Sequence, residues 1–147
     1  MSSSRAVLIV CFALGVVAWL IFARGSHSES LAYVRSWPEA LAAARSAGKP
    51  VLLSFGGPWC PACVALETRV FSDARIRELA ERFVCVKIDP RDPRDGRDAF
   101  RYKSTRYVPE VVFLDPEGEV ISRLESRDAE GVVAEMRAAL ARAGRGG

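Results

Sequence analysis

Short apolar runs separated by turn residues predict the strands of this chain. The runs at 51–55, 83–89 and 111–115 are rich in apolar, mostly β-branched or aromatic residues, which favour strands. Residues 51–55 are almost entirely apolar, as expected of a strand that is buried on both faces. A fourth run at 119–124 follows a Pro-Glu-Gly turn at 116–118, so the last two runs predict an antiparallel hairpin.

Capping residues and helical spacing predict the helices between these strands. Ser36 followed by Glu39 forms a capping box, and Gly48 is a typical helix stop, so a helix is expected up to Ala47. The segment 90–98 has too many Pro, Gly and Asp residues for either element and predicts a loop. Further helices are expected at 61–71, 74–82, 99–103 and 128–143.

The order of these elements predicts an α/β fold. A helix, a strand, two helices, a second strand, a loop with a short helix, a hairpin and a final helix follow one another. A strand–helix–strand unit gives parallel neighbours, whereas a hairpin adds antiparallel ones. We therefore expect a mixed central sheet with helices on both faces. The 147 residues leave room for one such domain.

The N-terminal pattern differs from the rest, because residues 6–22 contain no charge. As a helix they would reach roughly 26 Å, close to the roughly 30 Å hydrocarbon core of a bilayer and longer than the core of a signal peptide. Residues 1–24 therefore predict a signal-anchor or a signal peptide. The unbroken run with Trp19 near its end favours an uncleaved anchor, whereas Ala23 and Gly25 suit cleavage.

Either form of this segment places the rest of the chain outside the cytoplasm. We expect membrane contact through residues 6–22, with the domain on the extracytoplasmic side, periplasmic or extracellular, or a secreted domain if the segment is cleaved. The polar residues 25–35 predict a linker, and residues 36–147 predict the folded domain.

Composition and charge argue against two classes of protein. Half of the residues are apolar and 27% are charged, which is typical of a globular domain and not of a disordered chain. The formal charge of +3 comes from basic residues that are scattered among acidic ones. Because the sequence shows no stripe of basic residues, nucleic acid is not expected as a partner.

A Cys-Pro-Ala-Cys motif at 60–63 introduces candidate chemistry in a chain with four cysteines and one histidine. A zinc site needs three or four protein ligands. His27 lies in the predicted linker and Cys11 in the apolar segment, so no zinc site is expected. Two thiolates suit the soft ion copper(I), and this alternative stays open.

The position of the motif favours thiol–disulfide exchange over a passive crosslink. A disulfide across two residues closes a tiny loop and removes little entropy from the unfolded chain. Cys60 follows a buried strand and begins a helix, where unpaired amides and the helix dipole stabilise a thiolate. Cys63 lies one turn further on the same face, but deeper. We therefore expect Cys60 to attack a substrate disulfide and Cys63 to resolve the mixed disulfide.

Three stretches carry a resemblance to a known family. GKPVLLSFGGPWCPAC at 48–63, Val-Pro at 108–109 and VVFLDPEGEV at 111–120 resemble the thioredoxin-like family over nearly the whole chain after about Lys49. More narrowly, WCPACVALETRVFSD at 59–73 resembles the C-terminal thioredoxin domain of DsbD-type thiol:disulfide interchange proteins. In that family the domain passes electrons to exported thiol proteins. The resemblance implies a thioredoxin fold.

The resemblance also implies a role for each matching residue. Cys60 would be the nucleophile and Cys63 the resolving thiol of a redox-active disulfide. Pro109 would be a cis-proline that faces the pair, the Val108 backbone would bind an extended substrate segment, and Trp59 would shield the disulfide. Protein disulfide substrates and an upstream thiol electron donor are the implied partners, with no cofactor and no metal.

Two positions depart from the family pattern. Many thioredoxins carry a buried Asp six residues before the first cysteine, where this chain has Ser54. Glu67 is the candidate replacement as a catalytic proton acceptor, because its helical spacing from Cys63 places it below the sulfurs. A solvated surface carboxylate is the alternative for this residue. Glu110 stands where thioredoxins often have Thr, and its charge is expected in the substrate groove, where it would alter partner choice.

The residues between the cysteines bear on the direction of electron flow. Strong oxidants of the superfamily often carry His there, whereas Pro61 and Ala62 are uncharged. We therefore expect a reductase of exported proteins rather than an oxidase. A copper(I)-handling module for oxidase or cytochrome assembly and a non-catalytic binding domain are the alternatives. Cys85 is expected to pack as a small apolar group in its strand.

Overall fold

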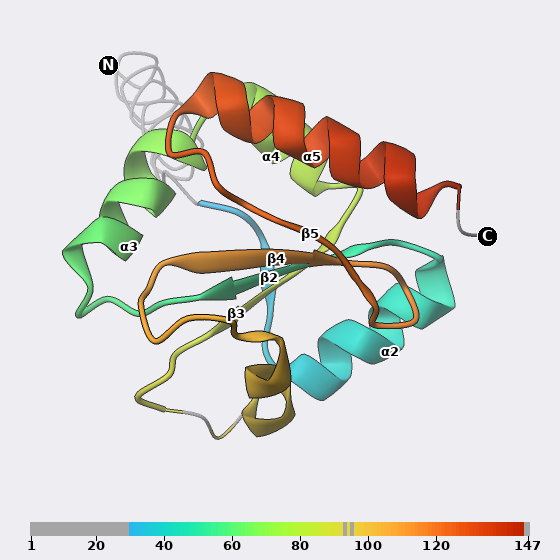
Figure 1. Ribbon diagram of the computed structural model, residues 1–147, viewed down its shortest axis with the longest axis horizontal. Coiled ribbons are helices and arrows are strands. Elements are labelled where there is room, and N and C mark those ends of the chain that lie inside the picture. The colour runs from blue at the N-terminus through green and yellow to red at the C-terminus, as the bar shows by residue number, and fades with distance from the viewer. Residues whose placement is uncertain (1–29, 93, 95, 146–147) are drawn as a thin grey trace, which may run out of the picture.

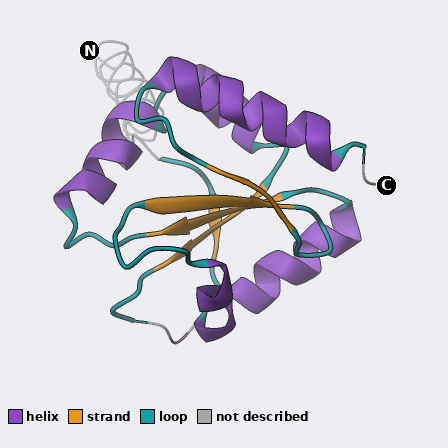
Figure 2. Cartoon of the chain, in the orientation of Figure 1, coloured by secondary structure: helices purple, strands orange, loops and turns teal. Residues whose placement is uncertain are grey.

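A mixed five-stranded sheet forms the centre of the domain (Figures 1 and 2). The computed structural model describes residues 30–92, 94 and 96–145. In the sheet order β1-β3-β2-β4-β5, β3 is parallel to β1 and β2, and β4 is antiparallel to β2 and β5. The strands are β1 (Tyr33–Val34), β2 (Val51–Phe55), β3 (Val84–Ile88), β4 (Glu110–Leu114) and β5 (Val120–Arg123). The expected mixed sheet with a C-terminal hairpin is confirmed.

Helices cover both faces of this sheet (Figure 1). One face packs against α2 and the 3₁₀ helix η3, and the other packs against α4, α5 and the helix that follows β2. That last helix begins as α3 and continues as a π-helical segment, η1. The bounds are α2 (Trp37–Ala47), α3 (Pro61–Ala65), η1 (Leu66–Val70), α4 (Ala74–Ala80), η3 (Arg97–Tyr102) and α5 (Ala129–Ala143).

Alternation along the strands assigns the apolar residues to two cores. Leu52 and Phe113 pack in the cluster that includes α5, whereas their neighbours Leu53 and Val112 pack in the cluster that includes α2. Successive side chains of a strand point to opposite faces, so a strand covered on both faces has to be apolar throughout. The nearly continuous apolar run of β2 follows from this arrangement.

The predicted caps of α2 are present. The Ser36 hydroxyl accepts the backbone N–H of Glu39 at 3.4 Å, and the Glu39 carboxylate accepts the N–H of Arg35 at 3.3 Å. At the other end Gly48 has a φ of 62°, a left-handed conformation that glycine adopts at low cost. These caps fix where α2 ends and β2 begins.

The N-terminal boundary of the domain differs from the expected one. β1 lies within the predicted linker at 25–35, yet Tyr33 and Val34 pair with β3 and extend the sheet. A strand of two residues is too short to give a periodic pattern. The predicted membrane segment at 6–22 lies outside the described residues. No helix in the described part of the chain combines the length and apolar character needed to cross a membrane.

Candidate functional site

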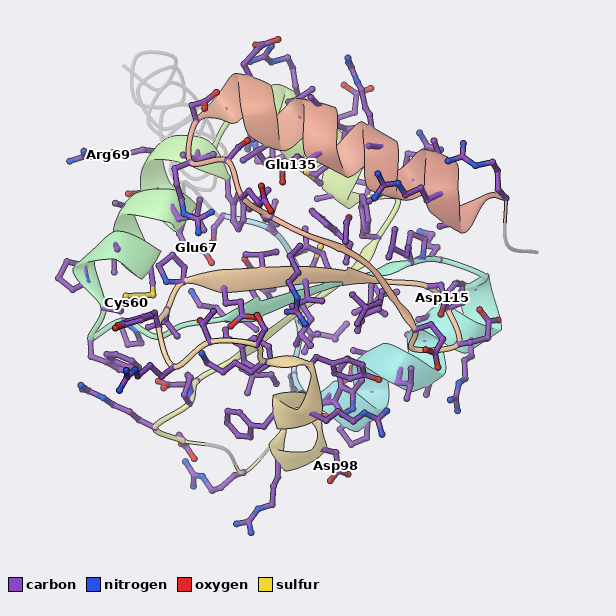
Figure 3. All side chains as sticks on the ribbon, in the orientation of Figure 1. Cys60, Glu67, Arg69, Asp98, Asp115 and Glu135 are labelled. Carbon is purple, nitrogen blue, oxygen red and sulfur yellow. A yellow bond between two sulfur atoms is a disulfide. The ribbon has the colours of Figure 1, made fainter. Side chains whose placement is uncertain are left out.

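The two cysteines of the motif form a disulfide at the N-terminus of α3 (Figure 3). β2 leads directly to this point, and Pro61 supplies the first helical residue with its preset φ. Cys60 is the N-cap, and its Sγ accepts the backbone N–H of Cys63 at 3.2 Å. A hydrogen bond from an amide that has no helical partner stabilises negative charge on that sulfur when the pair is reduced.

The two sulfurs differ more in their surroundings than in their exposure. Cys60 is 7% exposed and Cys63 is 3% exposed, so the attacking sulfur is less accessible than the sequence suggested. Cys63 packs closely on Gly56, where an added Cβ would lie 2.9 Å from its Sγ. The amide of Cys63 points at Cys60, and this contact distinguishes the two sulfurs.

A second segment faces the disulfide from β4. The Val108–Pro109 peptide bond is cis, as the family resemblance implied, and the Val108 carbonyl oxygen lies 3.9 Å from the Cys60 Sγ. Both residues are half-buried and stand at the start of β4. The structure therefore brings Cys60, Cys63, Val108 and Pro109 together at one end of the sheet.

Glu110 does not place a charge in the groove, and that expectation is wrong. The side chain is buried, and its carboxylate accepts hydrogen bonds from the backbone N–H and hydroxyl groups of Ser104 and Thr105 at 2.7–3.2 Å. Arg123 and Lys103 pair with it at 2.7 and 3.4 Å. Burial alone would raise the pKa of Glu110, but these hydrogen bonds lower it to about 2. Glu110 thus anchors the segment that leads to Pro109.

Trp59 is held in place by a carboxylate that the sequence did not reveal. Its indole N–H donates to both oxygens of Asp89, at 2.9 and 3.0 Å, and the Arg91 guanidinium lies 3.7 Å from its ring centroid. A Cβ at Gly57 would collide with the indole and with Asp89, so glycine is required there. In the sequence Asp89 is the last residue of an apolar run, and nothing in that pattern predicts its hydrogen bond with Trp59.

Glu67 lies in η1, the segment that continues α3, and is only 8% exposed. The alternative of a solvated surface carboxylate is therefore wrong. Its Oε1 accepts the Tyr33 hydroxyl at 2.7 Å and pairs with the Lys87 ammonium at 2.9 Å. Its Oε2 is buried and has no hydrogen-bond partner among the described residues.

The two donors to Glu67 come from neighbouring strands. Tyr33 belongs to β1 and Lys87 to β3, and sequence reasoning missed both because their contacts span 34 and 20 positions. Burial, and then the Glu67 carboxylate, raise the pKa of Tyr33 far above its usual range. Its hydroxyl therefore stays protonated and continues to donate to Glu67.

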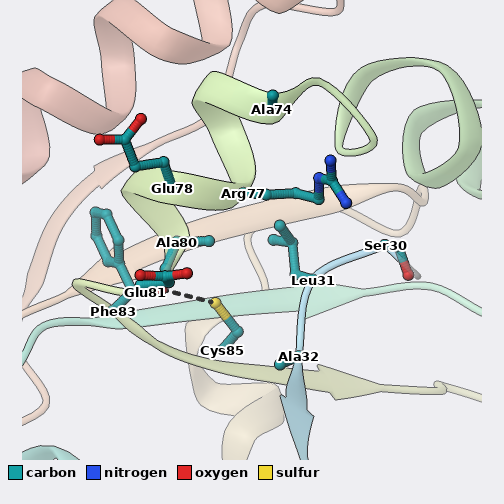
Figure 4. A pocket seen from close by; sticks show the side chains of 10 residues that line it. All are labelled: Ser30, Leu31, Ala32, Ala74, Arg77, Glu78, Ala80, Glu81, Phe83 and Cys85. Carbon is teal, nitrogen blue, oxygen red and sulfur yellow. Dashed lines mark hydrogen bonds between the residues drawn. The ribbon is translucent and has the colours of Figure 1, made fainter. Parts of the chain in front are cut away.

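Cys85 occupies a different environment, beside a cavity of about 480 Å³ between α4 and the segment before β1 (Figure 4). Its thiol donates weakly to the Ala80 carbonyl, with the sulfur 3.8 Å from that oxygen. Burial and the Glu67 carboxylate raise the pKa of the Cys85 thiol to about 12. The residue packs in the core as expected, and neither Cys60 nor Cys63 lines this cavity.

The described residues contain no group of three or more His, Cys, Asp or Glu side chains that could hold a metal ion. A two-thiolate copper(I) site needs only Cys60 and Cys63, so the copper hypothesis is untouched by this finding. Copper(I) binding by this pair remains a prediction, which a copper(I) titration would test.

Comparison with known proteins gives a consistent result. A family model described as thioredoxin-like matches residues 32–116. The thiol:disulfide interchange protein DsbD of Ralstonia nicotianae is 33% identical over 97 residues, which are 65% of this chain and 16% of that protein. The chain thus spans only a small part of this relative.

Solved structures show the same fold. A thioredoxin from Thermus thermophilus superposes with a TM-score of 0.66 and 29% identity, over 80% of this chain and 92% of the other. A DsbH oxidoreductase gives a TM-score of 0.61 and 26% identity, over 76% and 88%. The expected thioredoxin fold is confirmed.

Proposed function

Because this chain belongs to the thioredoxin-like family, we propose that it uses Cys60 and Cys63 to reduce disulfides in exported proteins. The observation that carries the proposal is the contact between the Cys63 amide and the Cys60 Sγ, opposite the cis peptide at Pro109. One end of the sheet thus combines a favoured thiolate, a second thiol within disulfide distance and a backbone carbonyl for substrate.

The reaction proceeds in two exchanges. The Cys60 thiolate attacks one sulfur of the substrate disulfide, so a Cys60–substrate bond forms, the substrate S–S bond breaks, and the departing sulfur takes a proton. The Cys63 thiol then loses its proton and attacks Cys60. The Cys60–Cys63 disulfide forms, and the second substrate thiol leaves. Two electrons pass to the substrate, and an upstream thiol protein returns them by the reverse steps.

Val108 and Pro109 bind the substrate in this scheme. An extended segment beside the half-buried Val108 can pair with its backbone, which brings a substrate sulfur next to Cys60. Glu110 supports this role, because its hydrogen bonds to Ser104 and Thr105 hold the preceding loop. In this proposal Trp59, which Asp89 holds in place, shields the disulfide.

Glu67 accepts the proton of Cys63 in the second exchange. Two donors occupy its Oε1, whereas the buried Oε2 has no partner among the described residues and is therefore available to take a proton. Helical spacing supports the pairing, since Glu67 follows Cys63 by four positions. This carboxylate replaces the acidic group that many thioredoxins carry at the position of Ser54.

The absence of charge at Pro61 and Ala62 supports the reductase direction, and the reduction potential tests it. A value near that of thioredoxin, about −270 mV, is expected, whereas a value near that of DsbA, about −120 mV, would show an oxidase. Trapping mixed disulfides with a Cys63→Ala variant tests the attack itself. Partners should be linked through Cys60 and released by reductant, and recovery of none would contradict the proposal.

The apolar residues 6–22 support a membrane anchor with the domain on the extracytoplasmic side. Fusion of a reporter that is active only after export to the C-terminus tests this orientation. Activity of the fusion, together with its retention in the membrane fraction after a high-salt wash, is the expected result. An inactive reporter would overturn the location without affecting the chemistry of the cysteines.

A further inference from the structure

Four exposed side chains lie next to residues of the site, in sequence or through a ring contact, and we call Val64, Arg91, Arg106 and Tyr107 the rim. Val64 directly follows Cys63, and Tyr107 directly precedes Val108. Three large apolar side chains are exposed in the described part of the chain, and two of them are these rim residues, with Tyr107 71% exposed. Exposed apolar groups beside a reactive site are typical of a surface that contacts a partner.

The rim also carries two cations. The guanidinium of Arg91 lies over the ring of Trp59 at 3.7 Å, and that of Arg106 lies 5.7 Å from the ring centroid of Tyr107. A guanidinium that stacks by its face on an aromatic ring keeps N–H groups at its edge for a carboxylate. Both cations are exposed and are held next to the residues that flank Cys60 and Val108.

Neither guanidinium forms an ion pair among the described residues. Asp89 receives the indole of Trp59, and Glu110 is buried among its own donors. The backbone N–H of Arg91 also donates to the Asp89 Oδ1 at 2.8 Å, so this carboxylate lies beside the rim. The two guanidinium groups of the rim are therefore available to pair with a carboxylate of a partner.

We propose that the rim selects protein disulfides whose attacked cysteine lies in an extended segment with an Asp or Glu one to three residues away. This inference rests on the proposed function and names its substrate class. A residue in an extended segment advances about 3.3 Å, so such a carboxylate lies within reach of an arginine beside Cys60. Paired charges at the edge of a binding surface mainly speed association and discriminate between partners.

Three synthetic peptides test the inference on the full-length chain in a non-ionic detergent, with Cys63→Ala as the background. Each peptide carries one cysteine as a mixed disulfide with neutral 2-thiopyridine, flanked by Glu, Gln or Lys. Attack by the Cys60 thiolate forms the peptide–Cys60 disulfide and releases 2-thiopyridone, whose absorbance gives the rate constant. The Glu peptide should react about tenfold faster than the Lys peptide at low salt and less than threefold faster in 1 M NaCl.

Variants of the rim locate the effect. Arg91→Gln with Arg106→Gln should lower the Glu:Lys rate ratio to about twofold or less, and Arg106→Glu alone should lower it without disturbing the contact between Arg91 and Trp59. Arg137→Gln, an exposed arginine on α5, is the matched control and should leave the ratio unchanged. The ratio is the readout because a change in the reactivity of Cys60 itself affects all three peptides alike.

The outcomes separate this inference from the proposed function. Equal rates for the three peptides, or a ratio that persists in the double variant, would overturn the rim as the selecting surface while leaving Cys60 as the nucleophile. If no peptide reacts with Cys60, both the inference and the proposed function fail.

Discussion

Cys60 follows β2 as the N-cap of α3, whereas Cys85 lies within the neighbouring strand β3. The two residues are almost equally buried, with exposures of 7% and 4%. Their surroundings are opposite in effect. The Cys60 sulfur receives a backbone N–H at a helix N-terminus, whereas the Cys85 thiol donates to a carbonyl and has a pKa raised to about 12. Burial and the Glu67 carboxylate raise the pKa of Cys85, whereas the backbone N–H that the Cys60 sulfur receives favours a thiolate there despite similar burial.

The local sequence explains why the surroundings of Cys60 and Cys85 differ. Gly56 and Gly57 end β2, and Pro61 starts a helix, so the chain turns and presents free amides to Cys60. Cys85 lies inside β3, where the amides are used in pairing with β1 and β2. The same residue type thus receives a backbone N–H at a helix start and donates to a backbone carbonyl within a strand.

Removal of the activated sulfur should give the largest effect. We expect Cys60→Ser to reduce the rate of insulin disulfide reduction by about a thousandfold or more, because a hydroxyl is a far poorer nucleophile than a thiolate. Turbidity of reduced insulin measures this rate. Insulin reduction by Cys60→Ser within tenfold of the unsubstituted protein would show that Cys60 is not the nucleophile.

Glu110 tests how the segment that faces Cys60 is held. Its pKa of about 2 lies below the usual 4.5, so the stability it contributes is present above about pH 4.5 and is lost as the pH falls toward 2. This shift corresponds to about 3 kcal/mol. Glu110→Gln should therefore lower the free energy of unfolding at pH 7 by about 2–3 kcal/mol and weaken its decline in acid.

Urea denaturation between pH 7 and pH 3 measures this difference. Glu117→Gln, an exposed carboxylate in the β4–β5 turn, is the control and should change the free energy of unfolding by less than about 0.5 kcal/mol. Parallel pH profiles for the unsubstituted protein and Glu110→Gln would show that the buried carboxylate does not anchor this segment.

Glu67 sharpens the comparison, because we propose that its carboxylate accepts the proton of Cys63 and the same carboxylate raises the pKa of Cys85. It follows Cys63 by four positions along the helix and adds to the effect of burial on the pKa of Cys85. We expect Glu67→Gln to slow the second exchange, in which Cys63 is deprotonated, about tenfold or more, while the first attack by Cys60 changes less than threefold. Rapid-mixing measurements of mixed-disulfide formation and decay separate the steps, with Glu78→Gln on α4 as the control.

Equal slowing of both exchanges would point to a structural role for Glu67. Tyr33→Phe offers a milder form of the same change, because it removes one hydrogen bond to the Glu67 carboxylate and keeps the ring. Its effect on the second exchange should be smaller than that of Glu67→Gln.

Cys85 should give the smallest effect on activity. Cys85→Ala removes a thiol that stays protonated at neutral pH, so insulin reduction should remain within about twofold. A larger loss, measured in the same turbidity assay with the fold verified by circular dichroism, would mean that this thiol takes part in the chemistry.

Contacts that are local in sequence were predictable, and contacts between distant segments were not. The caps of α2, the runs of β2 to β5 and the position of Cys60 follow from neighbouring residues. Tyr33 and Lys87 reach Glu67 only because β1 and β3 pair in the sheet. From the sequence we expected the charge of Glu110 to be exposed. Its hydrogen-bond donors, such as Ser104 and Arg123, reach it only in the folded chain.

Alkylation of the reduced full-length chain by iodoacetamide tests the central claim most directly. Mass spectrometry of the digested protein reports each cysteine separately over pH 6 to pH 9. Cys60 should be modified at neutral pH at least about tenfold faster than Cys63, while Cys85 stays unmodified throughout. Slow and equal modification of Cys60 and Cys63 would contradict the claim that the helix amides activate one sulfur.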